Sequence, residues 1–179
     1  MIPNYAPLIG RLIPTIRIRN AGGPVGNSPG TAGWPTNNKA IYVPFTLEPH
    51  EVPVSFDRVW HINGANAVTG TFDMAVLDLA GTRLGSVGST SQAGSVNVLQ
   101  IYSLSTVVAL TIPGSYYLGM SVSTTSATYF RNALGAARFG NALGMLEQLT
   151  AHPIPATATF AANTGTYMPW IGLIPVGQV

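Results

Sequence analysis

The stretch that most constrains the fold is residues 110–123, in which a Pro-Gly turn is followed by strict alternation of side chains. One set of alternate positions carries Tyr116, Leu118, Met120 and Val122. The intervening positions carry Tyr117, Gly119, Ser121 and Ser123. A period of two predicts a strand with one buried face and one small polar face. We expect the tyrosine at its start to hydrogen-bond back to the preceding corner.

The remaining apolar segments are short and are separated by turn signals. We expect strands at residues 41–47, 54–62, 71–79, 83–87, 96–102, 128–131 and 167–174, and an apolar segment at residues 104–112. Pro44 indicates an edge or bulged strand, because proline donates no ladder hydrogen bond. Glycines oppose a long helix after residue 131, so we expect at most one short helix, near residues 142–149. The pattern predicts an all-β fold, an antiparallel β-sandwich or jelly roll.

Residues 1–39 are dense in proline and glycine, at a spacing that opposes both a helix and a central strand. We therefore divide the chain into an extended N-terminal arm, residues 1–39, and a β-sandwich domain, residues 40–179. The arm is apolar enough to need a surface, and it could dock on a neighbouring subunit or fold back over its own sandwich. For docking, the expected interface residues are Ile9, Leu12, Ile13, Ile16, Arg17, Ile18, Arg19 and Trp34.

The chain carries very little charge. Charged side chains make up 8% of its residues, against about 25% in a typical soluble domain. Residues 84–130 contain none. Because charge normally keeps a free protein soluble and monomeric, this composition favours a protein packed against copies of itself or against other proteins. The alternative is a secreted or surface β-protein that relies on hydroxyl groups for solubility.

Several classes of partner are disfavoured by composition. The basic residues are scattered, which argues against a nucleic-acid interface. No run of about 18 apolar residues is present, so we expect no membrane insertion. The chain has no cysteine, which excludes disulfides and thiolate metal sites. Its N-terminus lacks the basic and apolar regions of an export signal.

The ionisable residues do not suggest a catalytic or metal site. The three histidines, His50, His61 and His152, have no second ligand at metal-like spacing. Asp73 and Asp78 are five residues apart, so a regular strand would point them to opposite faces. Asp78 is the better turn former, since its side chain can bond to backbone two residues on.

Glu147 is the last carboxylate of the chain, and we expect it to be solvated or paired with Arg131 or Arg138. No nucleophile elbow, phosphate-binding loop or dinucleotide fingerprint is present. With so few ionisable groups, acid–base catalysis has almost no candidates. We therefore expect no enzyme activity, no catalytic residue, no metal and no cofactor.

Aromatic side chains are the remaining candidates for a site. Tyr129, Tyr167 and Trp170 could stack on the sugar rings of a glycan or anchor a protein interface. Trp34 and Trp170 each neighbour a proline, which favours a role as interface anchors, because aromatics dominate interface hot spots.

Four segments together resemble small virion structural proteins of tailed bacteriophages, of the head-fibre, decoration or minor tail type. They are residues 40–45 (Ala-Ile-Tyr-Val-Pro-Phe), 78–84 (Asp-Leu-Ala-Gly-Thr-Arg-Leu), 113–118 (Pro-Gly-Ser-Tyr-Tyr-Leu) and 154–160 (Ile-Pro-Ala-Thr-Ala-Thr-Phe). With the last strand they span residues 40–174, in an order that resembles the family, and the arm lies outside the resemblance. The resemblance implies a β-sandwich exposed on a virion, usually oligomeric, and no catalytic residue carries over.

We therefore expect a non-enzymatic virion structural protein of the capsid-decoration or fibre/tail type, assembled in the host cytoplasm. It would form a homo-oligomer and pack on other capsid or tail proteins through its arm and apolar surfaces. The alternative is a carbohydrate-binding module on the virion that recognises a host surface glycan.

Overall fold

The computed structural model of the protein describes residues 28–65, 70–92 and 96–178. Its strands are β1 (Ser28–Gly33), β2 (Ala40–Leu47), β3 (Val54–Ile62), β4 (Thr71–Leu77), β5 (Arg83–Ser86), β6 (Thr90–Ser91), β7 (Leu99–Leu110), β8 (Gly114–Val122), β9 (Thr128–Ala133), β10 (Leu146–Gln148), β11 (Ala161–Ala162), β12 (Tyr167–Pro169) and β13 (Ile171–Pro175). Within these described ranges, two short helices interrupt the strands, the 3-10 helix η2 (Pro49–Glu51) and α2 (Ala137–Ala142). The all-β prediction is confirmed.

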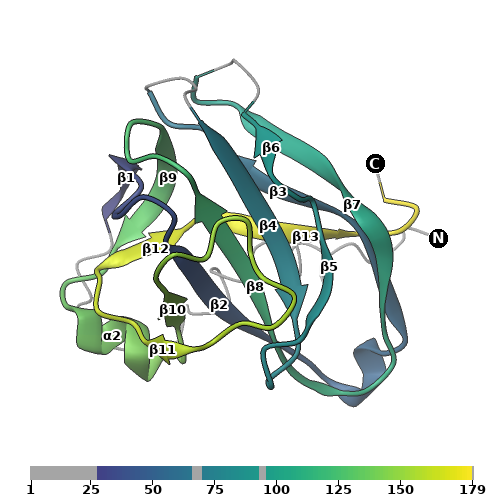
Figure 1. Ribbon diagram of the computed structural model, residues 1–179. Helices are drawn as coiled ribbons and strands as arrows, with labels where there is room; N and C mark the ends of the chain where they lie inside the picture. The colour runs from purple at the N-terminus through teal and green to yellow at the C-terminus, as the bar shows by residue number, and fades with distance from the viewer. Residues whose placement is uncertain (1–27, 66–69, 93–95, 179) are drawn as a thin grey trace.

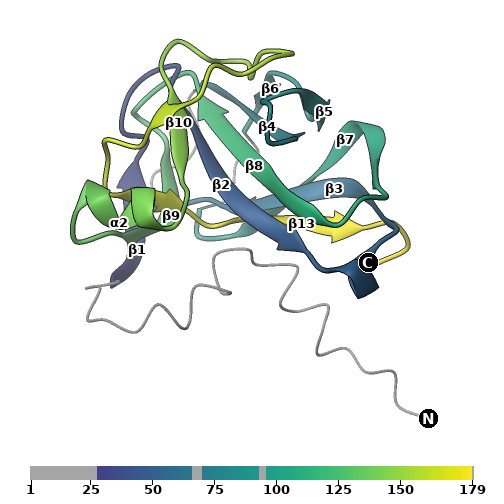
Figure 2. The same ribbon diagram turned by 90° about the horizontal axis from the view of Figure 1, so that it is seen from below.

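The strands form three antiparallel sheets that pack together as a sandwich. The largest sheet has the order β11-β10-β2-β8-β4-β5, with β6 paired to β4. The other two are β13-β3-β7 and β1-β9-β12. In Figures 1 and 2, β2, β8 and β4 lie across β3 and β13. The main core therefore fills the space between these layers, with Val76 and Met120 on one side and Phe56, Val59 and Leu173 on the other.

The strand predicted within residues 110–123 is β8, and it lies at the centre of the large sheet between β2 and β4. Leu118, Met120 and Val122 are fully buried in the main core, as the alternation predicts. The hydroxyl of Tyr116 donates a 2.8 Å hydrogen bond to the carbonyl oxygen of Ile112. The expected bond from the first tyrosine back to the corner is confirmed.

The opposite face of β8 is buried as well, which the alternation did not indicate. Residues 149–160 cross this face and form a second, smaller core. That core joins Tyr42 of β2 and Leu77 of β4 to Ile154 and Ala158. The large sheet is therefore covered on both sides, by a sheet on one and by a long loop on the other.

Pro44 does not mark the edge of the sheet, because β2 is bonded to β8 on one side and to β10 on the other. The pairing with β10 covers only the first residues of β2, ending at Tyr42 opposite Leu146. Pro44 comes after that end while still opposing Tyr117 of β8. Beyond Tyr42, β2 is therefore hydrogen-bonded on its β8 side alone. At such a position the missing N–H of proline leaves no ladder hydrogen bond unmade.

The N-terminal boundary lies earlier than expected. Strand β1 pairs along its whole length with β9, from Ser28 opposite Ala133 to Gly33 opposite Thr128. Trp34 is 2% exposed and lies in the main core. The expected boundary between residues 39 and 40 is thus corrected, because residues 28–39 are part of the sandwich. The other expected arm residues, Ile9 to Arg19, lie outside the described residues.

The segment after β9 also differs from expectation. The short helix is α2, at Ala137–Ala142, and residues 146–148 form strand β10 rather than helix. β10 is held between β2 and β11, so pairing with distant strands overrides the local leucine spacing. This strand brings Glu147 into the interior.

Candidate functional site

The most unusual polar site is a buried ion pair between Lys39 and Glu147. The Nζ atom of Lys39 lies 2.6 Å from Oε2 of Glu147, and each side chain is 6% exposed. Lys39 directly precedes β2, and Glu147 is the middle residue of β10, which pairs with β2. Lysine and glutamate are rarely buried unless they are paired, so the neighbouring strands position two groups that require each other.

Hydrogen bonds complete the surroundings of the Glu147 carboxylate. The backbone N–H of Thr164 donates to Oε2 at 3.0 Å, and the Thr164 hydroxyl donates to Oε1 at 2.7 Å. Burial raises the pKa of Glu147, but the hydrogen bonds from Lys39 and Thr164 outweigh it and hold the pKa below its usual value. The resting state is therefore a carboxylate facing an ammonium group.

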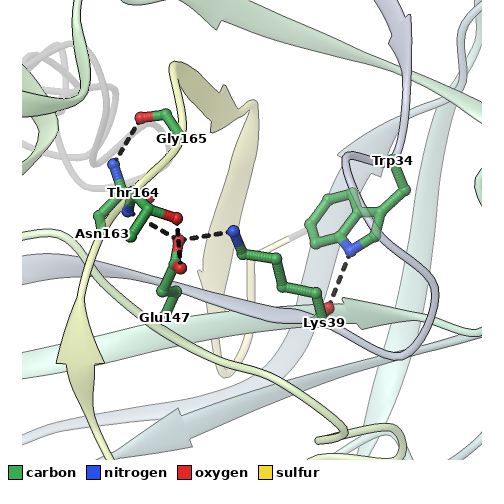
Figure 3. Close-up of polar contacts among 6 residues, drawn as sticks. All are labelled: Trp34, Lys39, Glu147, Asn163, Thr164 and Gly165. Carbon is green, nitrogen blue, oxygen red and sulfur yellow. Dashed lines mark hydrogen bonds and ion pairs between the residues drawn. The ribbon is translucent and has the colours of Figure 1, made fainter.

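Asn163 lies next to this ion pair with half of its amide unsatisfied (Figure 3). Its side chain is 2% exposed, and Nδ2 donates to the carbonyl oxygen of Gly165 at 2.7 Å. Its Oδ1 atom finds no donor within the part of the chain that the structure describes. A buried carbonyl oxygen without a donor lowers the stability of the folded state, so Oδ1 of Asn163 is an unusual feature of this interior.

A small space beside Gly165 brings these groups together. A Cβ atom built on Gly165 would lie 3.9 Å from Oδ1 of Asn163 and 4.0 Å from Nζ of Lys39. The indole of Trp34 donates a 2.8 Å hydrogen bond to the Lys39 carbonyl oxygen. Trp34 also packs edge-on against Tyr167 with ring centroids 5.3 Å apart. The amine of Lys39 and the amide of Asn163 thus lie around one point beside the partly exposed Gly165, and the amine is in contact with the Glu147 carboxylate.

A second polar cluster surrounds His152 in the loop that covers β8. Its Nδ1 lies 3.0 Å from the Ser121 hydroxyl, and its Nε2 lies 2.8 Å from the Thr71 hydroxyl and 3.3 Å from that of Ser89. Ser121 is fully buried. The cluster therefore fastens the covering loop to β4 and β8.

Asp73, on the same sheet, bonds to backbone rather than to His152. Its two carboxylate oxygens accept the N–H groups of Gly88 at 2.9 Å and Ile154 at 3.0 Å. Burial raises the pKa of Asp73, and these two hydrogen bonds oppose that shift. Asp73 is thus a second fastening point for the same loop.

His61, on β3, is fully buried. Neither ring nitrogen has a hydrogen-bond partner among the described residues. Burial lowers the pKa of His61 to about 3. The ring is therefore neutral throughout the physiological pH range.

A different kind of site runs along β7, the edge of the sheet β13-β3-β7. In the described residues β7 is hydrogen-bonded along one side only, to β3. Its twelve residues carry no charge and no proline. Large apolar side chains are exposed on β7 and in the residues leading into it: Val96 44%, Val98 45%, Leu99 50%, Ile101 48% and Val107 60%. We call these five residues the β7 surface.

The aromatic residues predicted to form a site are not brought together on the surface. Tyr129 is 1% exposed and Tyr167 is 6% exposed, and both lie in the main core with Trp34. Trp170 is half-buried, packs against Phe130 and donates a 3.1 Å hydrogen bond to Oδ1 of Asn132. Of the three, only Trp170 retains an accessible ring.

Glu147 pairs with Lys39, where Arg131 or Arg138 was expected. Sequence reasoning missed Lys39, Asn163 and the β7 surface. One signal could have pointed to Lys39. It is the only lysine in the chain, whereas the chain has seven arginines.

Two negative findings apply to the described residues. They include no group of three or more histidine, aspartate or glutamate side chains placed to hold a metal ion. They also include no helix with the length and apolar character needed to cross a membrane.

A scan against protein-family models finds no match, and a search of curated proteins finds no relative of this chain.

Proposed function

We propose that the protein is a non-enzymatic structural subunit of a bacteriophage virion, of the capsid-decoration or fibre/tail type, that works as a homo-oligomer. The observation that carries the assembly part is the β7 surface. Monomeric β-proteins protect their edge strands with charge, proline or a covering element. β7 carries neither charge nor proline, and β5 approaches it only near Thr106 and Val108 among the described residues. The virion assignment rests on the resemblance of residues 40–174 to phage structural proteins.

Burial of the β7 surface against another subunit would be favourable. Apolar burial contributes about 25 cal/mol per Å², and pairing at the edge would satisfy backbone groups at the same time. Because β7 has no charge to place against a partner, no ion has to lose its hydration on binding. Other virion proteins of the capsid or tail are the partners proposed for the same surface and for the arm.

The test compares two charge substitutions in the full-length protein by sedimentation velocity. The double variant Ile101→Lys/Val107→Lys puts charge on the β7 surface. The control, Leu79→Lys, adds charge at a side chain that is 60% exposed between β4 and β5. We expect a defined oligomer for the wild type and the control, and a smaller species for the double variant. A wild type that sediments as a monomer would rule out self-association.

The proposed role of the arm needs a truncation that respects the fold. Removal of residues 1–27 leaves β1 and Trp34 in place, whereas removal through residue 38 would take both from the sandwich. We expect the 28–179 fragment to fold and to lose incorporation into particles. Full incorporation of this fragment would show that the arm is not an anchor.

The alternative proposal, recognition of a host surface glycan, now rests on Trp170. This ring is partly exposed beside Phe130, and its indole N–H is already bonded to Asn132. A sugar platform would need Trp170 to keep one face open. Glycan binding that is abolished by Trp170→Ala and retained by Tyr129→Phe would favour this alternative over assembly alone.

A further inference from the structure

The only lysine of the chain is placed where lysines are seldom found. Lys39 is 5% exposed, while the protein's other cations are all arginine. Lysine, unlike arginine, can lose its proton when buried and then act as a nucleophile. A carboxylate that touches Nζ, such as Glu147 at 2.6 Å, can take that proton. The site therefore has a nucleophile and a base in contact.

Asn163 supplies an electrophile for this amine. Its carboxamide is buried, and its Oδ1 lacks a donor among the residues the structure describes. Oδ1 and the lysine Nζ face the same small space beside Gly165, each within about 4 Å of one point. Because Gly165 has no side chain at this point, the space between the two groups is open, and the reaction requires side-chain rotation to bring the amine to the amide carbon.

We propose that Lys39 and Asn163 join through an intramolecular isopeptide bond. The Lys39 Nζ attacks Cγ of Asn163, a new C–N bond forms, and the C–N bond to Nδ2 breaks. The amine and the carboxamide become one secondary amide, and the nitrogen of Asn163 leaves as ammonia. No oxidant or reductant is consumed.

Glu147 acts as the proton carrier in this step. The ion pair is the resting state, so Oε2 first accepts a proton from the Lys39 ammonium group. It then delivers that proton to the departing Nδ2 nitrogen, and it passes the second proton of the attacking nitrogen to the released ammonia, which departs as ammonium. The two hydrogen bonds from Thr164 hold the carboxylate in place.

The bond would lock the fold at a specific point. It would join the residue before β2 to the segment between β11 and β12, across β10. A cross-link between distant positions restricts the unfolded chain and so stabilises the folded one. This inference is independent of the proposed assembly, since it concerns the interior of one chain.

The test is the mass of the purified full-length protein. We expect an intact mass lower than the sequence mass by one ammonia. Trypsin would then fail to cut after Lys39, and one branched peptide would join residues 20–58 to residues 139–179. The sequence mass, or ammonia loss without the branched peptide, as a succinimide would give, would overturn the proposal.

Amine labelling of the denatured protein gives a second readout, because Lys39 is the only lysine. We expect reductive methylation to modify the α-amino group alone. Modification of the Lys39 side chain in the bulk of the protein would contradict the bond.

Two variants separate the chemistry from the fold. Glu147→Gln keeps the shape of the side chain and removes the proton carrier, and Lys39→Arg keeps the charge and removes the nucleophile. We expect both to show the sequence mass, with folding checked by near-ultraviolet circular dichroism. A branched peptide in Glu147→Gln would remove Glu147 from the mechanism. The wild-type mass decides the bond itself even if both variants fail to fold.

Discussion

The imidazole of His61 stacks on the ring of Tyr102, with centroids 5.7 Å apart and planes 10° from parallel. Phe72 and Tyr129 pack edge-on around the same imidazole. Protonation would place a charge in this apolar cage, and burial therefore lowers the pKa of His61 to about 3. A buried base of this kind links stability to pH.

We predict that stability falls as the solution is acidified below about pH 6.5. The unfolded chain binds a proton at His61 near that pH, whereas the folded chain does not until about pH 3. Each pH unit in this window lowers the free energy of unfolding by about 1.4 kcal/mol. At pH 5 the total loss from His61 is about 2 kcal/mol. His61→Phe should remove the His61 part of this dependence, measured by urea unfolding at pH 7 and pH 5. Burial also lowers the pKa of His152, which leaves a slope of the same sign in the variant.

His50→Gln, at an exposed histidine, is the control for that measurement. It should keep the wild-type slope. The window lies above the range in which Glu147 titrates, because the pKa of Glu147 is lowered from its usual value. An equal slope in wild type and His61→Phe would contradict the assignment.

Asp73 fastens the covering loop, so its removal should destabilise the fold. Asp73→Ala leaves the N–H groups of Gly88 and Ile154 without their acceptor. Hydrogen bonds to charged groups contribute about 1.5–3 kcal/mol each, so we expect a loss of about 3 kcal/mol in the free energy of unfolding. Asp57→Ala, at a partly exposed carboxylate paired with Arg58, should cost less than about 1 kcal/mol. Equal losses in the two variants would refute the role of Asp73.

Gly119 is predicted to be intolerant of a side chain. A Cβ atom there would lie 2.8 Å from the Tyr42 ring and 3.1 Å from Cδ1 of Ile154. Overpacking of this kind costs about 1–3 kcal/mol, so Gly119→Ala should lower the melting temperature. Gly30→Ala in β1 is the matched control, since no described atom lies within 4 Å of its Cβ position. A neutral Gly119→Ala would mean that the covering loop yields easily.

Tyr116→Phe tests the bond between the first residues of β8 and the preceding corner. The variant keeps the ring and removes the hydroxyl that donates to Ile112. We expect a loss of about 1 kcal/mol, the usual net contribution of one hydrogen bond. Thermal unfolding monitored by circular dichroism measures it, and an unchanged melting temperature would show that the bond adds nothing in water.

Local sequence patterns determined the strands and their turns. The alternation in residues 110–123 places Leu118 and Met120 on the buried face of β8, as the structure confirms. The predicted turn at Asp78 is also present, with its carboxylate accepting the N–H of Thr82 at 2.8 Å. These features depend on neighbours a few residues apart, and the sequence displays such neighbours directly.

Only the tertiary structure decided which surfaces and charges meet. Periodicity shows that Ser121 and Tyr117 share a face, but it does not show that residues 149–160 cover that face. Glu147 was expected near the arginines that precede it in the chain, yet the order β11-β10-β2 brings it to Lys39. Trp34 lies in the core because β1 pairs with β9. Strand order is set by burial summed over the whole sandwich, and no local stretch of sequence contains that sum.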